Sequence, residues 1–377
     1  MIPYQGLLFF YVTGLLLLPA VVLGLLGKPL KYYGLFFTAA MLVFIFSENG
    51  QLLALAAFCI WQALMCKLFF RLKNKSRVKF RVAATLSLIP LVIAKLSGIL
   101  PGLGFWGLLG ISYMTFRAVQ VLIDAYDGKL DALPLAELSY FVLFFPSVAA
   151  GPIDRYRRFS GDLNRRISRE EYAELLRRGI WKLMFGLLSG IVISGLILRI
   201  WLEPLPENGI AATVSYMYGY TFYLFFNFAG YSSMAIGTAY ILGVKLPENF
   251  DMPFLSVDMK DFWSRWHISL SSWLRDYVYT RFVMGALKSR RFKNRRTSSY
   301  IGYAVTFAIM GAWHGLTPAY LLYGVYHGIL MCINEALDLH WKYFKQMKRG
   351  KWARIILTVV TFHLFSFGLL IFSGRMV

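Results

Sequence analysis

The chain has 377 residues, of which 58% are hydrophobic and only 16% are charged. This composition excludes an ordinary soluble domain and is typical of a polytopic membrane protein. The formal net charge of +21 would suit nucleic acid, but no groove-reading or base-stacking motif accompanies it, so we expect no nucleic-acid partner.

Apolar runs recur along the whole sequence, and several approach the roughly 20 residues that cross a bilayer as a helix. They lie at about 5–27, 33–46, 51–70, 82–100, 103–123, 135–150, 180–200, 210–242, 299–313, 318–337 and 353–372. The first is too long for a signal-peptide core, so we expect a retained membrane helix. The shortest runs are typical of tilted or re-entrant pieces. The pattern predicts an all-α polytopic membrane protein of about ten or eleven helices in a single domain over 1–377.

The basic residues are clustered at 71–81, 155–182, 288–296 and 342–354. By the positive-inside rule these clusters mark cytoplasmic loops in the cell membrane, where they also attract anionic lipids. A second interpretation is a docking surface for an acidic cytosolic partner. Three apolar pieces separate the first cluster from the second, and three full crossings cannot return the chain to the same side. One of those pieces should therefore fail to span the membrane.

An amphipathic segment is expected at about 258–297. Four aromatic residues recur at helical spacing in its first part, with polar residues among them, which predicts one amphipathic helix at the interface or along a polar path. These aromatic residues are Phe262, Trp266, Trp273 and Tyr277. Asp258 precedes them and is the expected N-cap.

A helix break is expected at about 310–318, where His314, Gly315 and Pro318 separate two apolar runs. Irregular backbone at membrane depth is tolerated only if it is buried or lines a cavity. His314 therefore lies beside an expected pocket. An imidazole titrates near neutral pH and can take a proton from a hydroxyl nucleophile, so a general base is one interpretation and a packing histidine is the other.

His267 has two interpretations of similar weight: a structural polar link to Arg265 and Asp261, or a supporting role in catalysis. Packing roles are expected for His327, His340 and His363. No spacing among the five histidines suggests a metal site. The three cysteines lie in apolar runs without paired spacing, so we expect neither a disulfide nor zinc.

Three further polar residues lie within or beside apolar runs. Asp154, in a turn that begins with Gly-Pro, can pair with Arg155, Arg157 or Arg158. Arg117 and Asn227 should face the interior of the bundle, either as contacts between helices or along a tunnel.

Two segments resemble the signature of the membrane-bound O-acyltransferase family: 265–270 (RWHISL) and 310–315 (MGAWHG). Four more are similar to the branch that D-alanylates teichoic acids: 110–120 (GISYMTFRAVQ), 151–159 (GPIDRYRRF), 227–232 (NFAGYS) and 370–374 (LIFSG). The resemblance extends from about residue 50 to the C-terminus, whereas the first fifty residues match only in hydrophobicity.

This resemblance implies a ring of tilted, partly broken helices around a central tunnel, with His314 as the catalytic histidine and His267 as the second signature histidine. It also implies a small acidic carrier protein that brings D-alanine as a thioester on its phosphopantetheine arm, so the chain would bind no cofactor of its own. The acceptor would be a hydroxyl of lipoteichoic acid, and other D-alanylation membrane proteins of a Gram-positive cell would be partners.

The residues themselves agree with a carrier on the cytoplasmic side. Lys293 and Arg295 suit an acidic protein and its phosphodiester. Nearby apolar side chains would complete a small docking interface. These are Tyr277, Val278, Phe282 and Val283. Because a thioester is already activated, one histidine suffices to deprotonate the acceptor alcohol.

Two alternatives remain. One is O-acetylation of an exopolysaccharide, as in alginate-type relatives, against which the 151–159 motif weighs. The other is a lipid or small-molecule transporter, in which the intramembrane polar residues would line a substrate path. No acidic coupling residue lies at a convincing midplane position, which disfavours transport.

Overall fold

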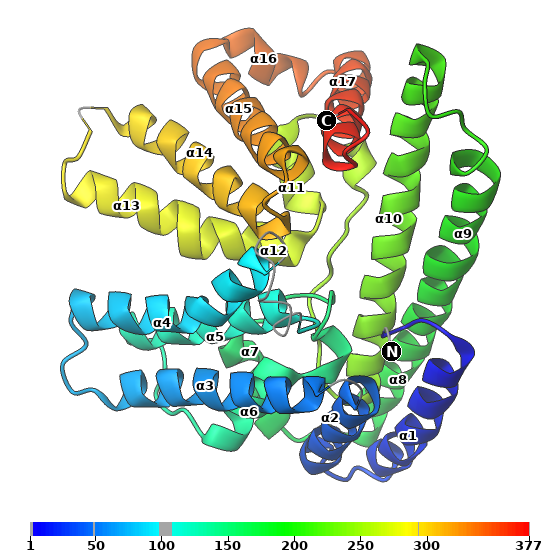
Figure 1. The fold of residues 1–377 in the computed structure, drawn as a ribbon, viewed down its shortest axis with the longest axis vertical. Helices are drawn as coiled ribbons and strands as arrows, with labels where there is room; N and C mark the ends of the chain where they lie inside the picture. The colour runs from blue at the N-terminus through cyan, green and yellow to red at the C-terminus, as the bar shows by residue number, and fades with distance from the viewer. Residues whose placement is uncertain (1–2, 48–49, 98–107, 293, 377) are drawn as a thin grey trace. The chain divides into compact units, whose positions relative to one another are not determined.

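The computed structural model describes residues 3–47, 50–97, 108–292 and 294–376 (Figure 1). Regular structure in these ranges is helical, apart from one isolated antiparallel bridge between Phe250 and Trp266. Four helical segments are long and apolar enough to cross a membrane: Leu7–Leu25, Gln51–Arg71, Arg169–Leu202 and Lys351–Phe372. The expected all-α membrane class is confirmed. The chain divides into two compact units, Met1–Leu187 with Gly230–Pro247, and Leu188–Ala229 with Glu248–Val377.

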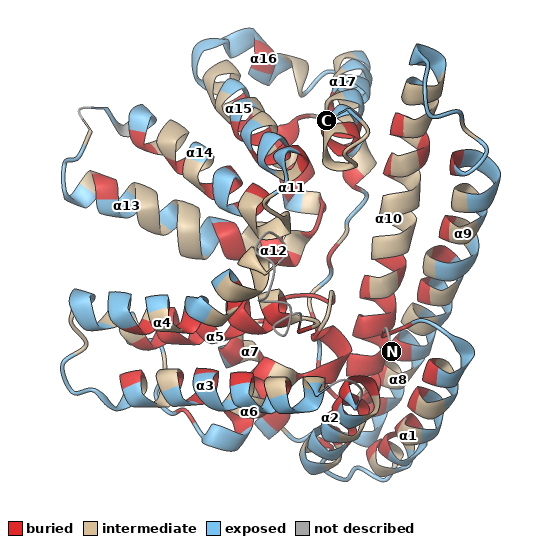
Figure 2. Cartoon of the chain, in the orientation of Figure 1, coloured by how far each residue is buried: buried red, intermediate tan, exposed pale blue. Residues whose placement is uncertain are grey.

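The described residues of the first unit form eight α-helices and the C-terminal part of a ninth. They are α1 (Leu7–Leu25), α2 (Lys31–Phe46), α3 (Gln51–Arg71), α4 (Arg77–Leu96), α5 (Ile111–Tyr126), α6 (Leu135–Leu143), α7 (Tyr156–Asn164), α8 (Arg169–Leu187) and α10 (Ile210–Ile241). A 3-10 turn, Phe145–Ser147, follows α6. Figure 1 shows α3, α4 and α5 side by side. Helix α5 is buried along almost its whole length (Figure 2).

Close helix contacts in this unit depend on glycines, as is common where membrane helices pack. A Cβ at Gly24 of α1 would overlap the ring of Tyr172 on α8. A Cβ at Gly237 of α10 would lie 2.6 Å from the carbonyl oxygen of Gly179 on α8. Helix α8 is thus held between α1 and α10 by residues that have no side chain at the contact.

The second unit begins with two π-helical turns, Leu188–Ile193 and Ile197–Leu202, around the short α9 (Ser194–Leu196), and includes the N-terminal part of α10. Its other helices are α11 (Met259–Arg265), α12 (Ile268–Leu274), α13 (Thr280–Lys288), α14 (Arg295–His314), α15 (Pro318–His340), α16 (Lys342–Met347) and α17 (Lys351–Phe372). A 3-10 turn, Pro253–Leu255, precedes α11, and a π turn, Arg275–Tyr279, joins α12 to α13.

Helices α14 and α15 form an antiparallel hairpin whose backbones touch. A Cβ at Gly311 would lie 2.6 Å from the carbonyl oxygen of Tyr320, and a Cβ at Gly324 would lie 2.5 Å from that of Phe307. Any larger residue at either glycine would push the helices apart. Because His314 ends α14 one turn after Gly311, this contact fixes the position of the histidine relative to α15.

Most apolar runs fold into the helices that they predicted, but one expectation was wrong. The amphipathic segment is not one helix, because the chain breaks at His267 between α11 and α12. The backbone N–H of Ile268 donates to the carbonyl of Asn249, and that of Asp251 donates to Arg265. A distant segment therefore supplies the partners that make the break stable. The Asp258 cap is confirmed, since its carboxylate accepts from the N–H of Asp261 at 2.8 Å.

The expectation that one of the three apolar pieces fails to span the membrane stays a prediction, since the candidate spans found among the described residues include none of the three. Helix α6 has nine residues and a length of about 14 Å, which cannot cross the roughly 30 Å hydrocarbon core. The expectation of a single domain over 1–377 stays a prediction.

Candidate active site

His314 is the last residue of α14 and is followed by Gly315, whose backbone is extended. Besides the neighbouring Trp313, three aromatic rings surround the imidazole: Phe372 at 4.9 Å between ring centroids, Tyr323 at 5.9 Å and Tyr320 at 6.1 Å. A Cβ at position 315 would overlap the Tyr320 ring, so a larger residue here would require that ring to move. His314 nevertheless keeps part of its surface accessible. The helix break therefore places a partly accessible imidazole in an aromatic setting.

His267 occupies the break between α11 and α12, and its backbone is left-handed with φ 44° and ψ 51°. Its ring is buried, 4.6 Å from Phe228 and 6.5 Å from Trp313 between centroids. Trp313 is itself 4.5 Å from His314. One indole thus lies against both signature histidines. The expected link from His267 to Arg265 and Asp261 is absent from the hydrogen bonds found among the described residues; those two side chains pair with each other at 2.7 Å.

His327 belongs to the same group of histidines and aromatic rings as His267 and His314. The sequence did not predict this proximity. The His327 ring is fully buried on α15, 4.5 Å from Tyr323 and 5.1 Å from Trp263. Tyr323 therefore lies between His327 and His314. The available signal was that the two histidines lie at and beyond the expected helix break, His327 within the apolar run that follows it. The three histidines are connected through two aromatic residues, and His314 is the only one of the three with substantial accessible surface.

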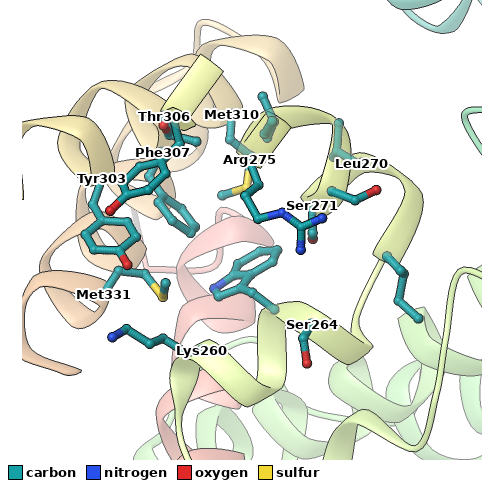
Figure 3. A pocket seen from close by; sticks show the side chains of 15 residues that line it. Lys260, Ser264, Leu270, Ser271, Arg275, Tyr303, Thr306, Phe307, Met310 and Met331 are labelled. Carbon is teal, nitrogen blue, oxygen red and sulfur yellow. The ribbon is translucent and has the colours of Figure 1, made fainter. Parts of the chain in front are cut away.

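A pocket of about 250 Å³ lies beside these rings, between α11, α12, α14 and α15 (Figure 3). Trp263 and Phe307 line it and also pack on His327. Figure 3 shows Tyr303, Thr306 and Phe307 along the wall formed by α14. The polar side chains of Lys260 and Arg275 contribute the positive charges of its lining. The cavity is thus mostly apolar, with cations that can bind an anionic group.

The ammonium group of Lys260 is held by carboxylates of α15. It pairs with Glu335 and, at 3.1 Å, with Asp338. Asp338 also accepts from Lys348 at 2.6 Å, and Lys348 pairs with Asp258 at the start of α11. This alternating set of charges joins α11 to α15 and to the connection between α16 and α17. It therefore fixes the side of the pocket on which Lys260 lies.

Comparison with known proteins identifies the family of the chain. The sequence model of the membrane-bound O-acyltransferase family matches residues 31–374, which include all three histidines. The chain belongs to this family. It is 44% identical to the teichoic acid D-alanyltransferase of Bacillus subtilis over 100% of this chain and 98% of the relative. It is 35% identical to the enzyme of that name from Streptococcus thermophilus over 99% and 95%.

A second set of relatives matches less of the sequence. The probable alginate O-acetylase of Pseudomonas aeruginosa is 32% identical over 71% of this chain and 49% of its own length. Membership in the O-acyltransferase family makes the protein a membrane-bound acyltransferase in a multi-pass arrangement, as the sequence predicted.

The expected docking residues of this O-acyltransferase lie on and before α13. Tyr277, Val278, Phe282 and Val283 are all partly buried. Val283 packs against α14, because a Cβ at Gly302 would lie 2.9 Å from its methyl group. Lys293 lies outside the described residues, and Arg295 begins α14. Their contact with a carrier stays a prediction.

The polar residues Arg117 and Asp154 have defined partners in the first unit. The Arg117 guanidinium is 1% exposed and donates to the carbonyls of Phe141, Val142 and Ser147 at 3.1, 3.2 and 2.6 Å. Among its three expected partners, Asp154 accepts from the Arg158 side chain at 2.7 Å. These contacts favour a structural role for both.

Two remaining predicted residues lie in the second unit. Asn227 is half-buried on α10, directly before the Phe228 that packs on His267. Arg265 pairs with Asp261 and Asp251 at the end of α11. Among the described residues, no group of three or more His, Cys, Asp or Glu side chains is arranged to hold a metal ion.

Proposed function

We propose that the protein transfers D-alanine from the phosphopantetheine thioester of a carrier protein to a hydroxyl group of lipoteichoic acid, with His314 as general base. The observation that carries this assignment is the position of His314. It ends α14 directly before Gly315, keeps accessible surface, and lies within the family signature. A base must be reached by the hydroxyl that it deprotonates, and His267 and His327 are buried.

The chemistry requires one proton to move. The acceptor oxygen attacks the thioester carbonyl while His314 takes the hydroxyl proton. The carbon–sulfur bond then breaks, and the proton from His314 passes to the departing sulfur to give a free thiol. No serine or cysteine nucleophile is needed, because the thioester is already activated.

The pocket of Figure 3 suits the donor. Its apolar walls and volume of about 250 Å³ accommodate a thin pantetheine chain. The basic cluster at 288–296 and the apolar residues of α13 provide a surface for an acidic carrier. His267 is assigned a positioning role, since it packs on Trp313 next to the base.

The D-alanyl group is favoured over acetyl by the extent of the matches. Three relatives named teichoic acid D-alanyltransferase match 99–100% of this chain and 95–98% of their own length. The alginate relatives match only 45–50% of theirs. The other membrane proteins of D-alanylation and anionic lipids complete the proposed partners.

The test is transfer by the full-length protein in liposomes that contain lipoteichoic acid, supplied with carrier loaded with radioactive D-alanine. The intact protein should label the acceptor, and His314→Ala should not. His340→Ala is the matched control, because His340 is exposed at the end of α15. Undiminished labelling by His314→Ala would exclude the general base. Labelling from an acetyl donor, but not from the D-alanyl carrier, would favour the alginate-type reaction.

A further inference from the structure

A second cavity, of about 810 Å³, lies in the first unit, far along the sequence from the histidines. Three connections form it: the turn between α1 and α2, the loop between α7 and α8, and the residues that follow α10. They meet at Gly243, where a Cβ would lie 3.0 Å from the side chains of both Leu30 and Ile167. The cavity is therefore built by tertiary contacts between distant segments. The proposed acyl transfer does not use it.

The charged lining of this cavity is strongly positive. Four cations, Lys28, Lys31, Arg165 and Arg166, face it with a single carboxylate, Asp162. Two helices begin at the cavity, α2 and α8, and two end there, α1 and α10, so their dipoles offset one another. The side-chain charges therefore decide which ligand is attracted, and an anion is favoured.

The four cations differ in how they are engaged. Lys31 pairs with Glu137 at 2.7 Å, and Arg165 pairs with Glu171 at 2.6 Å. Lys28 and Arg166 are exposed, and the ion pairs found among the described residues include neither. Two positive charges at the rim thus remain available to a ligand.

The location of the cavity indicates which anion it binds. Helix α1 is a candidate membrane span that ends at Leu25, three residues before Lys28, so the cavity lies at the level of lipid headgroups. Leu26 and Tyr32, on either side of this turn, are 67% and 77% exposed. The basic loops place this end in the cytoplasmic leaflet, where anionic lipids are available.

We propose that this cavity binds the phosphate headgroup of an anionic phospholipid. Lys28 and Arg166 contact the phosphate, and the acyl chains lie along the apolar surface of α1 beside Leu26. This site requires neither the carrier nor His314, so its test is independent of the proposed acyl transfer.

The test measures lipid binding by native mass spectrometry on the full-length protein in neutral detergent, titrated with phosphatidylglycerol or phosphatidylcholine. Phosphatidylglycerol should bind more tightly to the intact protein. Removal of two phosphate contacts by Lys28→Gln with Arg166→Gln should weaken that binding about tenfold or more. Phosphatidylcholine binding should not change.

The matched control is Lys73→Gln with Arg77→Gln, which removes the same charge from exposed residues just before and at the start of α4 in the same unit. Because all four residues are exposed, both double variants should keep the thermal midpoint of the intact protein. Equal weakening by both double variants would overturn the proposal, because general surface charge would then explain the binding. Displacement of phosphatidylglycerol by millimolar inorganic phosphate would also overturn it, because the cavity would then bind a free anion and not a lipid headgroup.

Discussion

The C-terminal ends of α6 and α14 each have a polar side chain beside them, but the two side chains differ in their surroundings. After α6, the chain turns at Phe145–Ser147, and the buried guanidinium of Arg117 binds the carbonyls that the helix leaves unpaired. After α14, the chain turns at Gly315, and the residue at the end is an imidazole that keeps accessible surface. In the first case the polar side chain is used up by the fold. In the second the imidazole keeps part of its surface accessible, as a general base that a hydroxyl must reach requires.

The largest effect is expected from His314→Gln, which keeps an amide near the position of the imidazole but cannot accept a proton at neutral pH. Transfer should fall by about 10²- to 10⁴-fold, the usual contribution of a general base. The thermal midpoint should stay that of the intact protein. Transfer of radioactive D-alanine in liposomes measures the activity, and a melting curve measures the thermal midpoint. A loss of activity below tenfold would exclude His314 as the general base.

Arg117→Leu should act on stability. The substitution leaves several buried carbonyls unsatisfied, so we expect a cost of about 3 kcal/mol in the free energy of unfolding. Denaturant unfolding in detergent measures it. Arg77→Leu is the control, because Arg77 is exposed at the start of α4. If both variants unfolded alike, Arg117 would not be the residue that holds this turn.

Gly311→Ala tests whether the α14–α15 contact positions the base. The added Cβ meets the carbonyl of Tyr320 at 2.6 Å, so the helices must shift, at a cost of about 1–3 kcal/mol. Gly14→Ala on α1 is the control, since a Cβ there meets no atom within 4 Å. The free energy of unfolding and the rate of transfer should both fall for Gly311→Ala and not for Gly14→Ala. Equal behaviour of the two variants would contradict the positioning role of the hairpin.

The smallest effect separates the roles of His267. Asparagine tolerates the left-handed backbone at φ 44°, whereas alanine is strained there by about 1 kcal/mol. If His267 positions its neighbours, His267→Asn should be more stable and more active than His267→Ala. A loss of transfer above a hundredfold in both variants would instead place His267 among the reacting groups.

Much of the fold was predictable because apolar length alone specifies where a membrane helix lies. The break at His314 was predictable too, since Gly315 and Pro318 act locally. The break at His267 was not, because it depends on the carbonyl of Asn249, eighteen residues away, and the aromatic spacing continues through it. His327 was missed for a similar reason: its relation to His314 arises only when α14 and α15 pack as a hairpin. Most partners of Arg117 are backbone carbonyls, which leave no trace in side-chain patterns.

The contact between Arg117 and the end of α6 also bears on biogenesis. An arginine at the centre of an inserting helix costs about 2.5–3.5 kcal/mol, and Arg117 lies near the middle of α5. Helix α6, with nine residues, is too short to insert as a span by itself. The carbonyls at the end of α6 accept hydrogen bonds from the Arg117 guanidinium of α5. The contact therefore satisfies the buried charge of one segment and the unpaired carbonyls of the other. The two should therefore enter the bilayer together, as one unit of insertion.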